Sequence, residues 1–346
     1  MSHPHRQPAS RLRRRARAAV FATLFLLPIA ASGCGGDGAT TPGNPTGGDP
    51  TADRLEITFA YSTGPSQSIE SMDIFQSAKD GRLAAPFIAT SDVELLPAWS
   101  RDGTRLLFTR DKLIPLGTVS NFVASLWIAN ADGSGARQLV IDQSSSTGPF
   151  PGSLYFNNQT NGAWSPDGTS IAFRRLLGST GEDGIAIIGA DGTGLRWLIQ
   201  GGDFPSWSVD GRIAFGMSGA IWTINPDGTA LKQLTPTGLY AVPKWSRDGT
   251  RLVYIKGSAN SSGTAYDIVV TRADGTDPRT LVTGGNNLNP SWSPDGQFIL
   301  YEHLELGEPA GPKCTLLKVP SSGGASVLLT PNRGVGYCGG AAWRPY

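Results

Sequence analysis

Histidine is scarce in this chain, and its scarcity limits the chemistry that the chain can perform. Only three histidines occur in 346 residues, and two of them, His3 and His5, lie in an arginine-rich N-terminal segment. A Ser-His-Asp site would depend on the third, His303, and no Gly-x-Ser-x-Gly motif is present to supply a nucleophile. A metal site built from several histidines is excluded by count. No Walker or dinucleotide-binding glycine motif follows an expected strand, so no cofactor is predicted.

Long helical patterns and a basic charge excess are missing as well. No segment after the N-terminal region alternates between strand and helix, whereas 45 glycines and 25 prolines favour many short strands joined by tight turns. The 29 basic and 28 acidic residues almost balance. Removal of the first 33 residues, which hold six arginines and no acid, leaves 23 basic residues against 28 acidic ones. The remaining domain is mildly acidic, which argues against a nucleic-acid partner.

The first 33 residues have the features of a bacterial export signal. Six arginines precede an apolar run, residues 20–31, that is too short to span a bilayer comfortably. The run leads into Ala-Ser-Gly-Cys34, which resembles the lipobox of bacterial lipoproteins. This resemblance implies that residues 1–33 are a signal peptide and that Cys34 is lipidated. Residues 34–53 are rich in Gly, Thr, Pro and Asp and are expected to form a flexible tether to a bacterial membrane.

One motif, Trp-Ser-x-Asp-Gly, recurs through the rest of the chain. Its tryptophans are separated by 38 to 65 residues, the range of a propeller blade with variable loops. An alternating apolar run and a second Asp-Gly follow most copies, a strong hairpin pattern in which Asp accepts from backbone amides and Gly adopts a positive φ. The structural residues of the repeat are Trp99, Asp102, Gly103, Trp164, Asp167, Gly168, Trp207, Asp210, Gly211, Trp245, Asp248, Gly249, Trp292, Asp295, Gly296 and, in a truncated last copy, Trp343.

The motif and its downstream Asp-Gly-Thr resemble the TolB-type β-propeller repeat, a relative of WD repeats, over roughly residues 55–346. The segment before Trp99 lacks a Trp strand, and the C-terminal Trp strand has no partners after it. Joining the two ends predicts an all-β, six-bladed propeller of four-stranded antiparallel blades over residues 54–346. The C-terminal strand would close the ring by pairing with the N-terminal blade, which removes exposed edges.

The expected partner site follows from the loops. The short Asp-Gly turns fall on one face, and the insertions fall on the opposite face, which is typical of a binding surface. Aromatic and arginine side chains often anchor such surfaces. The candidates are Arg110, Lys112, Tyr155, Asp203, Phe204, Tyr240, Asn289, Glu302, His303, Arg333 and Tyr337.

These features predict a non-enzymatic, membrane-anchored envelope protein, favoured as a monomer, that binds a protein, peptide or glycan in the periplasm or at the cell surface. TolB acts with a peptidoglycan-associated lipoprotein, so the resemblance implies that partner class. A passive scaffold is one alternative. The other is a glycoside hydrolase or lyase with two carboxylates in the propeller funnel, drawn from Glu302, Glu305, Glu308, Asp183 and Asp203.

Two cysteines, Cys314 and Cys338, remain after Cys34. Export places them in oxidising surroundings, so a disulfide is predicted, with two free buried thiols as the alternative. No metal is expected at the aspartates of the repeat, because their role in the turns is complete without one.

Overall fold

The computed structural model has two compact units, residues 1–47 and 48–346, of which only the second contains described residues. The structure describes residues 55–62, 72–81, 85–116, 119–140, 146–147, 154–155, 158–177, 180–260, 263–305, 313–329 and 338–345. The predicted signal peptide, the tether and Cys34 lie outside them. No helix in these ranges is long and apolar enough to cross a membrane.

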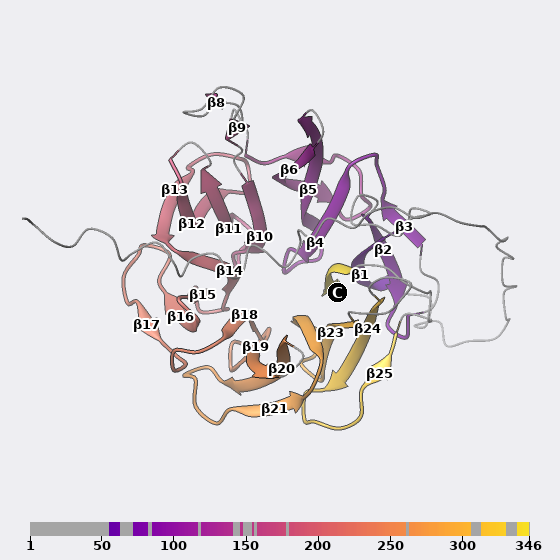
Figure 1. Cartoon of the computed structure of the whole chain (residues 1–346), viewed down its shortest axis with the longest axis vertical. Helices are drawn as coiled ribbons and strands as arrows, with labels where there is room; N and C mark the ends of the chain where they lie inside the picture. The colour runs from indigo at the N-terminus through magenta and orange to yellow at the C-terminus, as the bar shows by residue number, and fades with distance from the viewer. Residues whose placement is uncertain are drawn as a thin grey trace, which may run out of the picture. The chain divides into compact units, whose positions relative to one another are not determined.

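The second unit consists of β-sheets arranged around a central axis (Figure 1). The first sheet has the order β26 (Cys338–Trp343), β1 (Leu55–Ser62), β2 (Met72–Ala78) and β3 (Ala85–Ile88). The second is β4 (Val93–Trp99), β5 (Arg105–Leu116), β6 (Val119–Asn130) and β7 (Arg137–Gln138). The third is β10 (Asn158–Trp164), β11 (Ser170–Leu177), β12 (Glu182–Gly189) and β13 (Arg196–Gln200). The fourth is β14 (Gly202–Trp207), β15 (Ile213–Met217), β16 (Ala220–Ile224) and β17 (Lys232–Gln233).

The remaining large sheet has eight strands. One half contains β18 (Tyr240–Trp245), β19 (Arg251–Asn260), β20 (Gly263–Arg272) and β21 (Arg279–Val282). The other half contains β22 (Asn286–Trp292), β23 (Phe298–Glu305), β24 (Lys313–Pro320) and β25 (Val327–Leu328). A separate pair, β8 (Ser146–Thr147) and β9 (Leu154–Tyr155), lies in an insertion between β7 and β10.

The all-β propeller is as expected, but the prediction of six four-stranded antiparallel blades is wrong. Four sheets are four-stranded, and the strands from β18 to β25 form one sheet through a parallel contact between Tyr266 and Asn286. The Tyr266 amide donates to the Gly285 carbonyl over 2.9 Å, and Asn287 Nδ2 donates to the Tyr266 carbonyl over 2.8 Å. Gly284 and Gly285 both adopt a positive φ, and this turn brings β22 beside β20.

The two ends of the chain meet in the first sheet. β26 pairs antiparallel with β1, with Trp343 opposite Ile57. A disulfide joins Cys314 on β24 to Cys338 on β26, with a Cα–Cα distance of 5.8 Å. The disulfide therefore connects the strand that closes the first sheet to the sheet that contains β24.

The turn that follows most of the inner strands is built by its own side chains. In the copy at Trp164, Ser165 Oγ donates to Asp167 Oδ1 over 2.6 Å, and the Thr169 amide donates to the same oxygen over 3.0 Å. Gly168 adopts φ = 68° and its amide donates to the Ser165 carbonyl. The Ser165 hydrogen bond is the main reason why the pKa of Asp167 is lowered. The carboxylate is thus occupied by the turn itself.

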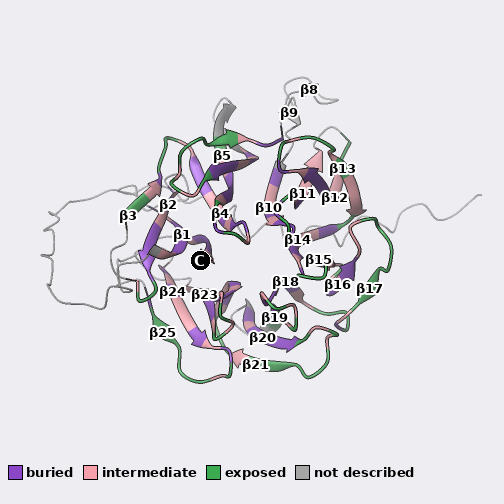
Figure 2. Ribbon diagram, turned by 180° about the vertical axis from the view of Figure 1, so that it is seen from behind, coloured by how far each residue is buried: buried purple, intermediate pink, exposed green. Residues whose placement is uncertain are grey.

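Tryptophan and arginine side chains connect neighbouring sheets. Trp164 Nε1 donates to the Ala98 carbonyl over 3.0 Å, and the Arg105 guanidinium lies 4.5 Å from the centre of the Trp164 ring. Arg105 also donates to the Gly168 carbonyl over 2.6 Å. The sheet faces are buried, whereas the outer strands β17 and β25 are exposed (Figure 2). The most occluded part of the unit is therefore built from the inner strands and the strands next to them.

Candidate functional site

A cavity of about 250 Å³ lies where the inner strands of the sheets meet. Its wall comes from β4, β10, β14, β18, β22 and β26, and consecutive members of this series are neighbours around the axis, with β26 next to β4. Aromatic side chains lie beside short polar ones in the lining. The aromatic members are Trp99, Trp164, Phe204, Trp207 and Trp343. Such a mixed, concave lining is characteristic of a ligand site.

Each inner strand contains a residue with positive φ three positions before its tryptophan. These residues are Leu96, Asn161, Phe204, Val242, Asn289 and Gly340, with φ values of 54°, 55°, 52°, 54°, 49° and 97°. All six line the cavity. The pairing with the adjacent strand shifts register at this position in all six strands. The cavity is therefore surrounded by a ring of β-bulges, which we call the bulge ring.

The bulge ring concentrates backbone strain around the cavity. A non-glycine residue in the left-handed region costs of the order of 1–3 kcal/mol, and for a β-branched residue such as Val242 the conformation is a genuine outlier. Strain of this kind gathers at binding and catalytic sites. The bulge ring was not predicted from the sequence, although the sequence contains a signal for it. Proline, which is confined to edges and bulges within sheets, follows the strained residue in four strands as Pro97, Pro205, Pro243 and Pro290.

Lys244 is the long side chain in the cavity wall one position before the tryptophan. The corresponding residues of the other inner strands are alanine or serine, and all of them line the cavity. Burial lowers the pKa of Lys244 to about 8, although the negative charge of Asp203 acts to raise it. Lys244 is not among the site residues predicted from the sequence.

An arginine crosses the ring at the end of the inner strands. Arg101 follows β4 and Arg247 follows β18, and these two strands are three steps apart in either direction around the axis. Arg247 nevertheless donates to the Arg101 carbonyl over 3.2 Å. Burial and the charge of Arg101 both lower the pKa of Arg247. Two guanidinium groups therefore lie near one end of the cavity.

Asp203 belongs to a polar cluster beside the cavity. Its Oδ1 accepts from Asn161 Nδ2 over 2.8 Å and from the Phe204 amide over 2.7 Å. Its Oδ2 lies 3.7 Å from Arg174, which also forms two hydrogen bonds of 2.9 and 2.8 Å with Asp183. Burial raises the pKa of Asp203, and Arg174 counteracts this. Two carboxylates of the predicted enzyme site thus share one guanidinium, and Asp203 and Asp183 do not line the cavity.

Glu302 joins two members of the bulge ring. Its Oε2 accepts from Asn289 Nδ2 and its Oε1 accepts from the Gly340 amide, both over 2.7 Å. The residue is 2% exposed. Burial raises the pKa of Glu302 to about 7, against the lowering effect of both hydrogen bonds. Glu302 thus holds the bulges of β22 and β26 from behind the cavity wall.

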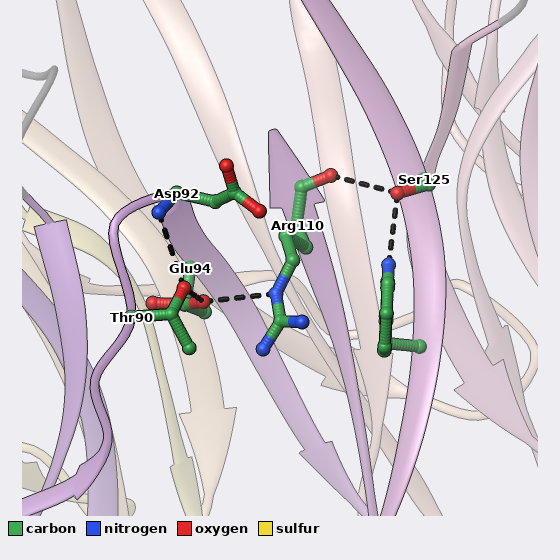
Figure 3. A network of polar contacts seen from close by, with 6 residues as sticks. Thr90, Asp92, Glu94, Arg110 and Ser125 are labelled. Carbon is green, nitrogen blue, oxygen red and sulfur yellow. Dashed lines mark hydrogen bonds and ion pairs between the residues drawn. The ribbon is translucent and has the colours of Figure 1, made fainter. Parts of the chain in front are cut away.

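The Arg110 side chain makes contacts within the propeller and is not directed to a partner surface (Figure 3). Its Nε donates to Glu94 Oε1 over 2.9 Å, and the same oxygen accepts from Thr90 over 2.6 Å. Its guanidinium lies 4.1 Å from the centre of the Trp127 ring. The Glu94 side chain is fully buried, which raises its pKa even though Thr90 and Arg110 act to lower it.

The other predicted partner residues are dispersed among the described elements. Lys112 is exposed on β5. Tyr240 contacts Tyr254 edge to face at 5.9 Å, and His303 Nδ1 lies 2.8 Å from Asn287 Oδ1. Of the eight candidates whose side chains the structure describes, it brings Phe204 and Asn289 into the cavity wall, with Asp203 and Glu302 directly behind it. The side chain of Tyr155, and Arg333 and Tyr337 entirely, lie outside the described residues.

No group of three or more His, Cys, Asp or Glu side chains in the described ranges could hold a metal ion. The enzyme alternative stays a prediction, because neither the cavity wall nor the Arg174 cluster shows which reaction such groups would perform.

Comparison with known proteins identifies the class to which this propeller belongs. The TolB beta propeller domain family matches residues 51–346, and the chain belongs to that family. TolB from Acinetobacter baumannii is similar in structure, with a TM-score of 0.65 and 18% identity over 84% of this chain and 67% of that chain. A chain of the nidogen/laminin complex is similar in fold, with a TM-score of 0.59 and 12% identity over 84% of this chain and 98% of that one.

The curated relatives match over short segments. The Tol-Pal system protein TolB of Xanthomonas campestris pv. campestris (strain B100) is 30% identical over 87 residues, which is 25% of this chain and 19% of the relative. The protein of the same name from Xanthomonas oryzae pv. oryzae (strain PXO99A) is 36% identical over 59 residues, 17% of this chain and 13% of the relative. The chain thus matches less than a fifth of the length of these relatives.

Proposed function

We propose that this protein is a non-enzymatic binding protein of the bacterial envelope whose central cavity receives a peptide segment of a partner protein. Anchoring through a lipid on Cys34 would place the propeller in the periplasm or at the cell surface. Membership of the TolB propeller family supports this proposal, and so do relatives named as components of a Tol-Pal system.

The observation that carries the proposal is the bulge ring. Phe204, Val242 and Asn289 hold strained backbone around one cavity, together with aromatic and amide side chains. Strained backbone conformations cluster at ligand-binding sites, active sites and switch regions, which supports a binding role for this cavity. The cavity volume of about 250 Å³ lies just below the ~300–1,000 Å³ typical of pockets for drug-sized ligands. Such a space suits a few side chains of an inserted segment, not a folded domain.

The longer loops around the ring are expected to contact the rest of the partner. This part of the proposal comes from the sequence alone, since many residues of the insertions between the strands lie outside the described ranges.

A cavity-filling variant tests the proposal. Ser291→Phe should fill the cavity, and Val327→Phe changes the exposed outer strand β25 as a matched control. Both variants and the wild type would be used to capture proteins from envelope extract, with recovery quantified by mass spectrometry. At least one captured protein should fall by tenfold or more with Ser291→Phe and stay constant with Val327→Phe. Equal recovery with both variants would contradict the proposal.

Folding of the filled variant is checked by thermal melting. If Ser291→Phe melts far below the wild type, Ala98→Leu offers a smaller filling change on another strand of the same wall.

A further inference from the structure

The charge of the cavity wall has one sign. Among the described residues, Arg101 and Lys244 are the charged members of the lining, and no aspartate or glutamate contributes to it. Arg247 adds a third positive charge through its contact with the Arg101 carbonyl. This contrasts with the mildly acidic composition of the domain as a whole.

The amino group of Lys244 has no counter-charge at contact distance. Within the described ranges, no hydrogen bond or ion pair engages its Nζ. The nearest influence is Asp203, whose Oδ1 already accepts two hydrogen bonds and whose Oδ2 faces Arg174. Partial burial of an ammonium without a partner disfavours its charged form, which is consistent with the lowered pKa of Lys244.

Two neutral donors accompany these cations. The indole N–H groups of Trp207 and Trp343 have no hydrogen-bond partner among the described residues, and both tryptophans line the cavity. Trp343 is 8% exposed. In Trp164 and Trp292 the same group donates to the carbonyl of a neighbouring inner strand, whereas that of Trp245, which does not line the cavity, is also unpaired among the described residues. Buried donors are normally paired, so the indole N–H groups of Trp207 and Trp343 are available to an acceptor that enters the cavity.

We propose that the cavity recognises a carboxylate of the inserted peptide segment, bound by Lys244 with the arginines Arg101 and Arg247 at the end of the ring. The inference rests on the proposed function and names the chemistry of its ligand. A carboxylate supplies two oxygens that accept charge-assisted hydrogen bonds from an ammonium or guanidinium and neutral ones from indole N–H groups. The apolar side chains of Phe204 and Val242 lie in the same lining and lower the local dielectric constant, which strengthens this attraction.

Short synthetic peptides test the inference on the whole chain. The probes are acetyl-Ala-Ser-Glu-Ser-Ala-amide, its Gln counterpart, and acetyl-Ala-Ser-Ala with a free terminal carboxylate. The two carboxylate probes distinguish a side chain from a chain terminus, and inorganic phosphate serves as a different anion. Binding is followed by NMR of the lysine Nζ groups, with Lys244 assigned through Lys244→Gln.

At least one carboxylate peptide should bind with at least tenfold higher affinity than the Gln peptide and than phosphate. Its binding should raise the pKa of Lys244 from about 8 toward the ordinary 10.5. Lys244→Gln should weaken this binding by at least tenfold, whereas Lys232→Gln on the exposed strand β17 should not change it.

Several results would overturn the inference. These are equal binding of the Gln peptide or of phosphate, unchanged affinity in Lys244→Gln, and no perturbation of Lys244 by either carboxylate peptide at about 10 mM. A Lys244 pKa at or above 10.5 in the free protein would also overturn it, because a carboxylate would already be paired with the amine.

Failure of the inference is distinguishable from failure of the proposed function. If Ser291→Phe loses the captured envelope protein and Lys244→Gln retains it, the cavity binds a partner without carboxylate recognition. If both variants retain it, the proposed function itself is wrong.

Discussion

At the scale of single residues, the bulge ring depends on a few buried polar contacts. Glu302 is the clearest case, because its two oxygens accept from residues of the ring on two different strands. Its carboxylate takes a proton more readily in the folded chain than in the unfolded one, since burial raises its pKa to about 7 from 4.5. The folded state therefore binds more protons than the unfolded state between these two values.

The raised pKa of Glu302 in the folded state predicts how the free energy of unfolding depends on pH. The contribution of Glu302 to the free energy of unfolding should be greatest below pH 4.5 and should fall as the pH rises through 7, by at most about 3 kcal/mol. Glu302→Gln removes this dependence. In urea unfolding between pH 4.5 and 8, the variant should gain stability relative to the wild type as the pH rises.

The difference between the two proteins is the informative quantity, because Asp111, whose pKa burial also raises to about 7, contributes equally to both. A difference that stays constant with pH would contradict the role assigned to Glu302.

A substitution at Gly340, whose backbone amide donates to Glu302, tests the backbone part of this contact. Its φ of 97° is unfavourable for any residue with a side chain, and an added Cβ would lie 3.0 Å from Leu96 Cα. Gly340→Ala should therefore destabilise the fold by about 1–3 kcal/mol in thermal or urea unfolding.

Gly323→Ala is the matched control for Gly340→Ala. Gly323 also has a positive φ, 87°, but nothing lies within 4 Å of an added Cβ. The loss at Gly340 should exceed the loss at Gly323, because only Gly340 adds steric contact within the ring. Equal losses would mean that the ring itself is not tightly packed at this point.

Residue-level roles were only partly predictable from the sequence. Phe204 and Asn289 could be selected because they are aromatic or polar residues on the face expected to hold the insertions. Arg110 was selected for the same kind of reason, yet it is paired with Glu94. Side-chain type does not reveal such a partner, because the two residues meet only after the strands pair. Lys244 was missed because a lysine within a strand resembles any exposed position.

At the scale of elements, the inner strands are joined to their neighbours by arginine side chains. Arg251, at the start of β19, lies 4.5 Å from the centre of the Trp292 ring. It also donates to the Gly296 carbonyl over 3.1 Å and to Ser321 Oγ over 3.3 Å. The planar guanidinium makes all these contacts at once, which an ammonium cannot do.

Arg251→Lys should therefore cost about 1–2 kcal/mol in urea unfolding, through the lost hydrogen bond and ring contact. Arg272→Lys is a matched control, because Arg272 is 72% exposed and contacts Asp277 at 3.7 Å on the surface. Equal effects of the two substitutions would show that the contact between Arg251 and Trp292 adds no stability.

The elements themselves follow from the sequence better than their connections do. Alternating apolar residues and Asp-Gly pairs are local signals, and the strands and tight turns form where these signals occur. The parallel contact between Tyr266 and Asn286 has no such local signal. It arises from a Gly284-Gly285 turn whose consequence depends on the neighbouring sheet, so the division into separate blades was predicted wrongly.

At the scale of the whole propeller unit, closure depends on the contacts of β26. This strand pairs with β1 and is tied to β24 by the Cys314–Cys338 disulfide. The two cysteines are 24 residues apart, and in the chain-entropy model a loop of this size stabilises the fold by about 3 kcal/mol.

Replacement of both cysteines by serine should lower the free energy of unfolding by about 3 kcal/mol in urea titrations. Dithiothreitol should produce a similar loss in the wild type and none in the double variant. Unchanged stability after both treatments would show that β26 is held by its strand pairing alone.

The central claim concerns the cavity at the middle of this unit. The most direct test is photo-crosslinking in the envelope with benzoylphenylalanine in place of Leu96 or Phe204, which already carry large side chains on two different strands of the cavity wall. Leu231, an exposed residue outside the wall, is the control position. Both cavity positions should crosslink to the same short segment of one partner protein, and Leu231 should not. Adducts no more frequent than those at Leu231, or adducts to unrelated proteins from the two cavity positions, would contradict the claim.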